Sequence, residues 1–217
     1  MKIVRHVNRL FSSNTYILFL DDQKDFWVID PGDFDFIDNW IQRNHKSLKG
    51  VLLTHSHFDH IYGVDQLLEK YPSARLFASA YAKEGLCSEK INGSKYQDNP
   101  FTIKHNDIES IREGNSIELW NGHEAGVVET AGHGRDCITY KIGFNLFTGD
   151  SLIPGVKVFT KMKYGDKNQA EDSIKRILSQ YSDDSIIWPG HMDSCTLGEV
   201  KREHILLSKS NPRIIAI

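Results

Sequence analysis

Short hydrophobic runs alternate with polar segments along this chain of 217 residues. Residues 15–20 and 26–29 are hydrophobic and flank the polar segment Asp21–Lys24, a pattern that predicts two strands joined by a turn. Further runs of the same kind predict strands over residues 50–53, 117–120, 126–129, 137–142, 145–148 and 185–188. Strand signals are therefore present in both halves of the chain.

Other segments have hydrophobic residues at the three- and four-residue spacing that places them on one face of a helix. Three such sets are Phe36, Ile37, Trp40 and Ile41, then Val64, Leu67, Leu68 and Tyr71, and then Ala170, Ile174, Ile177, Leu178 and Tyr181. A final helix is expected from about residue 197 to residue 208. By contrast, residues 85–115 are polar and carry turn signals at Asn92-Gly93 and Asn99-Pro100, so we expect that stretch to be irregular.

The order of these elements predicts one α/β domain over residues 1–217. No Ser/Gly/Pro-rich linker, low-complexity tract or short repeat interrupts the pattern. The composition, with 40% hydrophobic and 25% charged residues, is that of a compact folded protein. Each half of the chain ends hydrophobic strands in polar clusters, which suggests two sheets whose strand ends contribute to one site.

Charge and hydropathy exclude several classes of function. The chain has 26 basic and 29 acidic residues, a net charge of −3, so it lacks the positive field of a nucleic-acid or membrane-surface binder. No apolar stretch approaches the roughly 18 residues of a transmembrane helix, and the N-terminus lacks a signal-peptide pattern. The three cysteines, Cys87, Cys137 and Cys195, are far apart. This usage fits a reducing compartment, so we expect a cytoplasmic protein.

The most informative segment is Thr54-His55-Ser56-His57-Phe58-Asp59-His60, directly after a predicted strand. Histidine is uncommon, so three histidines in six positions indicate a metal site. In a turn after a strand, His55 and His57 can converge on one ion, and Asp59 and His60 can face a neighbouring one. Imidazole with carboxylate suits zinc, and also iron, manganese or cobalt.

Three later segments also place a potential metal ligand at the end of a predicted strand. His133 lies in the glycine-flanked loop ETAGHG, Asp150 ends FTGD, and His191 ends PGH. Any one of them alone would be read as a capping or surface residue. Together, and in this order, they extend the predicted metal site to the second half of the chain.

The stretches THSHFDH, ETAGHG, FTGD and PGH resemble the ligand motifs of the metallo-β-lactamase superfamily in order and approximate spacing. The closing segment is most similar to the glyoxalase II (hydroxyacylglutathione hydrolase) branch and its short single-domain relatives. The resemblance implies a four-layer αβ/βα sandwich, with two mixed sheets flanked by helices and the site at one edge. It implies two divalent metal ions, most simply zinc, with iron or manganese as alternatives. The implied ligands are His55, His57 and His133 for the first ion, Asp59, His60 and His191 for the second, and Asp150 as the bridge.

Such a centre predicts hydrolysis of a small thioester or ester, in which a metal-bridging hydroxide attacks the carbonyl carbon. Asp59 is expected to orient the hydroxide and pass its proton to the leaving group, and Asp150 to hold both ions together. Two divalent ions, two carboxylates and a hydroxide leave the centre positive, which favours an anionic small-molecule substrate. Lys157, Lys161 and Lys163, soon after Asp150, could hold a carboxylate or could form a solvated basic loop.

Other activities remain open within this resemblance. A persulfide dioxygenase-like enzyme would use one iron held by two histidines and Asp150, and a metallo-lactonase would share the whole ligand set. The aspartate at position 150 disfavours penicillin hydrolysis, since class B β-lactamases usually have Cys or Ser there. Only 26 residues follow His191, so no C-terminal helical domain for binding glutathione is expected. The oligomeric state is not predicted.

Overall fold

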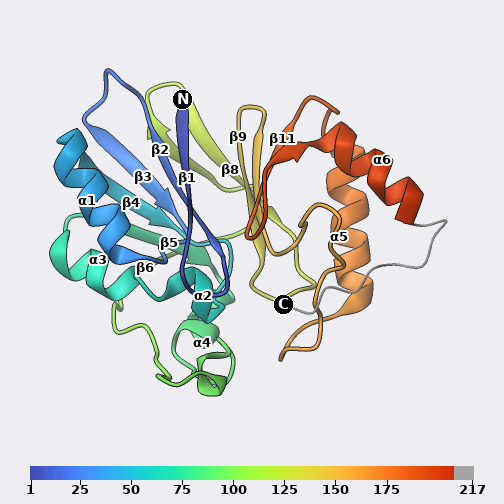
Figure 1. Cartoon of the computed structure of the whole chain (residues 1–217), viewed down its shortest axis with the longest axis horizontal. Helices are drawn as coiled ribbons and strands as arrows, with labels where there is room; N and C mark the ends of the chain where they lie inside the picture. Colours follow the sequence, from blue (N-terminus) through green and yellow to red (C-terminus); the bar gives the residue numbers. More distant parts are fainter. Residues whose placement is uncertain (208–217) are drawn as a thin grey trace. The chain divides into compact units, whose positions relative to one another are not determined.

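The computed structural model describes residues 1–207, with side chains to residue 202 (Figure 1). The chain forms two compact units, Met1–Ile111 and a second unit that begins at Arg112. Each unit contains one six-stranded sheet and its own helices. Within the described residues, no helix is both long enough and apolar enough to cross a membrane.

The sheet of the first unit is mixed. Its strands are β1 (Lys2–Val7), β2 (Asn14–Phe19), β3 (Asp25–Ile29), β4 (Ser47–Leu52), β5 (Arg75–Ser79) and β6 (Ile108–Ile111), and they lie side by side in that order. The pairs β1–β2 and β2–β3 are antiparallel, whereas β3 to β6 run parallel. Polar residues that follow β3 and β4 are therefore brought to one edge, at the carboxyl ends of neighbouring parallel strands.

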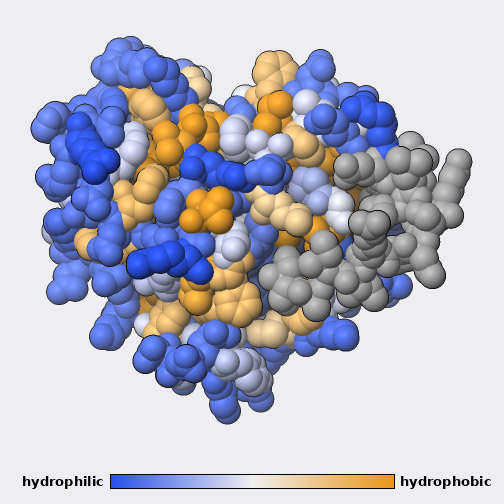
Figure 2. All heavy atoms as spheres, viewed as in Figure 1, coloured by the Kyte–Doolittle hydropathy of each residue, from blue (hydrophilic) through white to orange (hydrophobic). Residues whose placement is uncertain are grey.

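Helices α1 (Phe34–Asn44) and α3 (Val64–Lys70) cover the sheet of this unit (Figure 1). Their predicted apolar faces, including Ile37 and Leu67, pack in the core with Val28 and Val51 of the sheet. The outer surface over both helices is mostly hydrophilic (Figure 2). Three shorter elements complete the unit: α2 (Phe58–Ile61), α4 (Ala82–Leu86) and the 3-10 helix η1 (Ser94–Tyr96).

The sheet of the second unit is also mixed. Its strands are β7 (Ser116–Trp120), β8 (His123–Glu129), β9 (Ile138–Ile142), β10 (Asn145–Gly149), β11 (Ile186–Pro189) and β12 (Cys195–Thr196), in the spatial order β12-β11-β10-β9-β8-β7. Only β10 and β11 are parallel, and α5 (Lys167–Gln180) connects them. Helix α6 (Leu197–Leu207) follows β12. Ile177 of α5 packs against Leu146, Ile187 and Leu197.

The predicted fold class, α/β with two mixed sheets flanked by helices, is confirmed. The expectation that residues 85–115 are irregular is wrong in part, because this stretch contains η1, β6 and the end of α4. Sequence patterns also missed β1, β5 and β12. β1 is only partly buried and β12 has two residues, and the hydrophobic run Leu76-Phe77-Ala78 of β5 is shorter than the run that reveals β2. Residue 208, the predicted end of the last helix, lies outside the described residues.

Candidate metal centre

Four of the predicted ligands follow β4 in the first unit. His55 and His57 lie in the loop after the strand, and Asp59 and His60 lie on the single turn of α2. All four side chains are buried. Burial of four ionisable groups within six residues is costly unless they are paired or bound to an ion, which is the first indication of a site.

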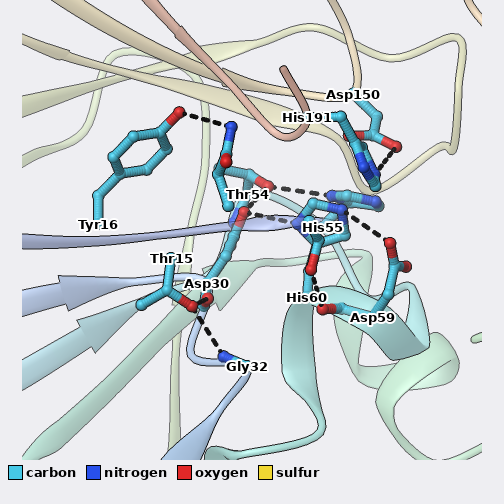
Figure 3. Close-up of polar contacts among 12 residues, drawn as sticks. Thr15, Tyr16, Asp30, Gly32, Thr54, His55, Asp59, His60, Asp150 and His191 are labelled. Carbon is cyan, nitrogen blue, oxygen red and sulfur yellow. Dashed lines mark hydrogen bonds and ion pairs between the residues drawn. The ribbon is translucent and has the colours of Figure 1, made fainter. Parts of the chain in front are cut away.

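A buried aspartate that the sequence analysis did not select organises this loop. Asp30 follows β3 with φ = 50°, and its carboxylate accepts hydrogen bonds from Thr54 N (2.8 Å) and Thr54 Oγ1 (2.6 Å). Thr15 Oγ1 donates to the Asp30 carbonyl oxygen (2.7 Å), which holds the backbone at this left-handed residue (Figure 3). The available signal was an aspartate at a strand end directly before Pro31-Gly32.

The Asp30 network determines which histidine nitrogen can bind a metal. The carboxylate of Asp30 can only accept, so His60 Nδ1, at 3.1 Å from Oδ2, carries the proton and donates it (Figure 3). The single hydroxyl proton of Thr54 is already directed to Asp30, so His55 Nδ1, at 3.0 Å from Oγ1, is likewise the donor. In both rings the lone pair is therefore on Nε2. This is the tautomer in which Nε2 can bind a metal.

The distance between neighbouring ligand atoms also fits a metal. His60 Nε2 lies 3.5 Å from Asp59 Oδ2. This is longer than the roughly 2.7–3.2 Å of an ordinary hydrogen bond. It is close to the separation of about 3.4 Å between two ligands that bind one tetrahedral ion at about 2.1 Å each. The structure thus places these two side chains together as a pair of ligands would be.

The other three predicted ligands lie in the second unit, and all are buried. His133 lies in the loop after β8, Asp150 follows β10, and His191 follows β11. A single oxygen, Asp150 Oδ2, lies 3.5 Å from His133 Nε2 and also 3.5 Å from His191 Nε2. One carboxylate oxygen thus lies at the separation of a ligand pair from two imidazole nitrogens.

The tautomer of His133 is set by the backbone. His133 Nδ1 lies 2.7 Å from the carbonyl oxygen of Phe159, which can only accept, so Nδ1 donates and Nε2 carries the lone pair. Phe159 belongs to the loop that also carries the predicted lysines. Lys157, Lys161 and Lys163 are exposed, which keeps both interpretations of that loop open.

Gly132 allows the His133 loop to lie close to α5. Its φ is 144°, and a Cβ atom there would be 2.3 Å from the Ala170 backbone. The Gly132 carbonyl oxygen accepts a hydrogen bond from Asp166 N (2.8 Å). Cys137 closes the same loop, since its Sγ accepts from Gly134 N (3.2 Å) and burial raises the pKa of its thiol. A neutral buried thiol of this kind is a packing group and not a nucleophile.

A second buried carboxylate lies beside α2. Burial alone would raise the pKa of Asp33, but hydrogen bonds from Tyr62, His6 and Arg9 outweigh it and hold that pKa at about 2. The Tyr62 hydroxyl donates to Asp33 Oδ1 (2.6 Å), and burial together with this bond raises the pKa of Tyr62. Tyr62 therefore supports the fold beside the ligand segment.

Comparison with known proteins agrees with this geometry. The family described as the metallo-beta-lactamase superfamily matches residues 8–191. Hydroxyacylglutathione hydrolase 1 of Vibrio vulnificus (strain YJ016) is 31% identical over 207 residues, which is 95% of this chain and 72% of that protein. Hydroxyacylglutathione hydrolase of Aeromonas salmonicida (strain A449) is 29% identical over 82% of this chain and 61% of that protein. The chain therefore spans only part of the length of these relatives.

Among solved structures, the BLEG-1 B3 metallo-β-lactamase is 25% identical and has a TM-score of 0.85. The match covers 97% of this chain and 98% of that one. The matched region of the family runs through both units and includes all seven predicted ligands.

Proposed function

This chain belongs to the metallo-β-lactamase superfamily, and on that premise we propose that it is a binuclear metal hydrolase of a small thioester or ester. The coarser statement, that it is a hydrolase of this fold, is confirmed by the family match and by relatives that are named as hydrolases. We propose residues 1–217 as one catalytic domain. Its support is a family match that extends through both units.

The observation that carries the proposal is the position of Asp150. Its Oδ2 atom lies 3.5 Å from a nitrogen of His133 and 3.5 Å from a nitrogen of His191. In the proposed assignment these histidines bind different ions. His133 shares the first ion with His55 and His57, and His191 shares the second ion with Asp59 and His60. One carboxylate oxygen at this distance from both nitrogens fits the proposed role of Asp150 as the bridge.

When bound, divalent metal ions would lower the pKa of a bound water to about 7, which would make a nucleophile available at neutral pH. The residues of this chain would hold the ions and orient the reacting groups. Asp150 lies 3.5 Å from His133 and 3.5 Å from His191 and is the proposed link between the two sets of ligands. Asp59 is the proposed proton carrier, because its buried carboxylate lies beside His60 and can pass a proton to the leaving group.

We propose zinc as the metal, because the donor set combines imidazole nitrogens with carboxylates, and iron or manganese would also fit it. An anionic substrate is favoured by the positive charge that two bound ions would supply. Lys157, Lys161 and Lys163 add positive charge on the loop that orients His133. The names of the relatives suggest a hydroxyacylglutathione thioester as the first substrate to test. A cytoplasmic location is part of the proposal and rests on cysteine usage.

Metal content and turnover of the purified protein, measured together, test this function. We expect about two zinc ions per chain and hydrolysis of lactoylglutathione or another small thioester. The panel should include simple esters, lactones and a glutathione persulfide.

One iron per chain with oxygen uptake on the persulfide would replace the proposal with a persulfide dioxygenase-like function. Two metals with turnover of lactones alone would make the protein a lactonase. Two metals without turnover of any substrate would contradict the proposed chemistry and leave only the metal site.

A further inference from the structure

The segment between β5 and β6 lies against the metal-ligand segment of the same unit. It contains α4 and η1, and α4 lies near α2 in Figure 1. Its sequence is polar, yet Asn92 and Ser94 are both fully buried, with 0% of each residue exposed. Buried polar side chains outside the ligand set require an explanation, because each is costly unless it is hydrogen-bonded.

Asn92 satisfies both ends of its side chain within this segment. Its Nδ2 donates to the carbonyl oxygen of Phe101 (2.8 Å), and its Oδ1 accepts from Ser94 N (2.8 Å). Its own N–H donates to Ser88 O (2.9 Å). Gly93 follows with φ = 83°, so the chain turns sharply there. Three hydrogen bonds therefore determine where the main chain of Asn92 lies.

Ser94 closes the same turn from the other side. Its hydroxyl donates to Phe101 O (2.9 Å) and accepts from Phe101 N (3.0 Å). Phe101 is thus bonded to both buried polar residues. Asn92 and Ser94 form one rigid turn, which we call the Asn92 clamp.

The clamp reaches the metal ligands through the main chain. The carbonyl oxygen of Asn92 accepts a hydrogen bond from Phe58 N (2.9 Å), the first residue of α2. Helix α2 has only four residues, Phe58–Ile61, and carries Asp59 and His60. One helical turn is not stable by itself, so the orientation of α2 depends on such tertiary bonds.

An independent contact joins the same two segments. A Cβ atom on Gly85 of α4 would lie 1.9 Å from Oγ of Ser56 and 2.7 Å from its Cβ. Ser56 is buried and lies between His55 and His57. Helix α4 therefore packs directly on the ligand loop, and the segment between β5 and β6 contacts it at Ser56 and at Phe58.

We propose that Asn92 is a positioning residue, which holds α2 so that Asp59 and His60 present their ligand atoms 3.5 Å apart. The effect on metal binding rests on the proposed function, whereas the effect on α2 does not. Asn92→Ala removes both side-chain bonds. It keeps the main-chain carbonyl oxygen that Phe58 N uses, but that oxygen is no longer fixed by the turn. Groups that orient metal ligands are typically worth 10- to 100-fold in metal affinity or activity.

The test compares Asn92→Ala with a matched control, Asn145→Ala. Asn145 also makes one donated and one accepted bond through its side chain, to Ile142 O and from Trp188 Nε1, at the end of β10 remote from Asp150. For the Asn92 variant we expect affinity for the second zinc to fall 10- to 100-fold, and kcat to fall by a similar factor with little change in KM. The control should lose stability and keep both metals.

Hydrogen exchange of the metal-free proteins separates this inference from the proposed function. We expect the amides of residues 57–61 to exchange at least tenfold faster in Asn92→Ala than in wild type or Asn145→Ala. Unchanged exchange in this segment would overturn the positioning role, whatever the metal content. Faster exchange in Asn92→Ala, together with a wild-type protein that binds no zinc when zinc is added, would support the clamp and contradict the hydrolase.

Ser94→Ala is the milder second variant, for use if Asn92→Ala does not fold. It removes the hydroxyl bonds to Phe101 and leaves Asn92 intact. A smaller change in the same direction is expected, both in exchange and in metal affinity. Wild-type values in both measurements would contradict the proposal.

Discussion

At the scale of single residues, the candidate site depends on hydrogen-bond acceptors that fix each histidine ring. Asp30 accepts from His60, and Phe159 O accepts from His133, so a lone pair is left on each Nε2. Asp150 places its Oδ2 3.5 Å from Nε2 of His133 and 3.5 Å from Nε2 of His191. The residue with the largest predicted effect is therefore the shared carboxylate.

Asp150→Ala should abolish both metal binding and turnover, because the proposed bridge holds two ions at once. Zinc content by atomic emission and thioester hydrolysis, measured on the same sample, check this. Full turnover in this variant would show that the bridging assignment is wrong.

Asp59→Asn is the comparison variant at the same scale. It should keep much of the first metal, since His55, His57 and His133 are untouched, while turnover falls by roughly 10²–10⁴-fold as expected for loss of a proton-transfer group. An unchanged rate would remove Asp59 from the proton pathway.

Asp33 contributes in a different way, through stability. Its pKa is held at about 2, below the ordinary 3.8, by Tyr62, His6 and Arg9 against the effect of burial. A carboxyl with a lowered folded-state pKa stabilises the fold fully above about pH 4, and this contribution is lost as the pH falls toward 2. The difference corresponds to about 2 kcal/mol.

In metal-free protein, Asp33→Asn should lower the free energy of unfolding by about 2 kcal/mol at pH 5–7, and the deficit should shrink between pH 4 and pH 2. Urea denaturation across this range measures it. Asp35→Asn is the control, because Asp35 is exposed and only approaches Arg9 at 4.0 Å. A deficit that stays constant down to pH 2 would show that the charge of Asp33 is not the cause.

At the scale of elements, α5 anchors the loop that carries His133. Asp166 caps the helix by accepting hydrogen bonds from Asn168 N (2.8 Å) and Gln169 N (3.0 Å). Its own N–H donates to Gly132 O, one residue before His133. The start of the helix and the ligand loop are thus joined at one residue.

Asp166→Ala should lower the free energy of unfolding by about 1 kcal/mol, the usual cost of losing an N-cap, and Asp166→Ser should recover most of it. Urea denaturation is the measurement. Asp172→Ala, on the exposed face of α5, is the control, since its ion pair with Lys175 is solvent-exposed. Equal losses for Asp166→Ala and Asp172→Ala would contradict the capping role.

At the scale of the whole molecule, bound metal should stabilise the folded chain. A ligand at 100 times its Kd that binds only the folded state adds about 2.7 kcal/mol. For a chain of this size, 1 kcal/mol shifts Tm by about 2–4 °C, so chelation should lower Tm by roughly 5–10 °C per ion. Calorimetry with and without a chelator tests this, and Asp150→Ala should show little shift. The same shift in that variant would indicate that the ions bind elsewhere.

Much of this molecule can be predicted from local sequence. The periodicity of Ile37 and Ile41, or of Val64 and Leu67, indicates a helix because those side chains must share one buried face. The continuous hydrophobic run that becomes β2 indicates a strand that is buried on both faces. The candidate ligands were equally visible, since each follows a predicted strand and its type limits the chemistry it can perform.

Only the tertiary structure decided which distant groups meet. Asp30 and His60 are 30 positions apart, and no periodicity relates them. The bond from Phe58 N to Asn92 O joins a one-turn helix to a stretch that the sequence indicated as irregular. Local sequence patterns indicate which residues are buried, because burial follows from the type of a residue and of its neighbours in sequence. Hydrogen-bond partners across elements depend on how those elements pack, so the supports of the candidate site became visible only in the folded chain.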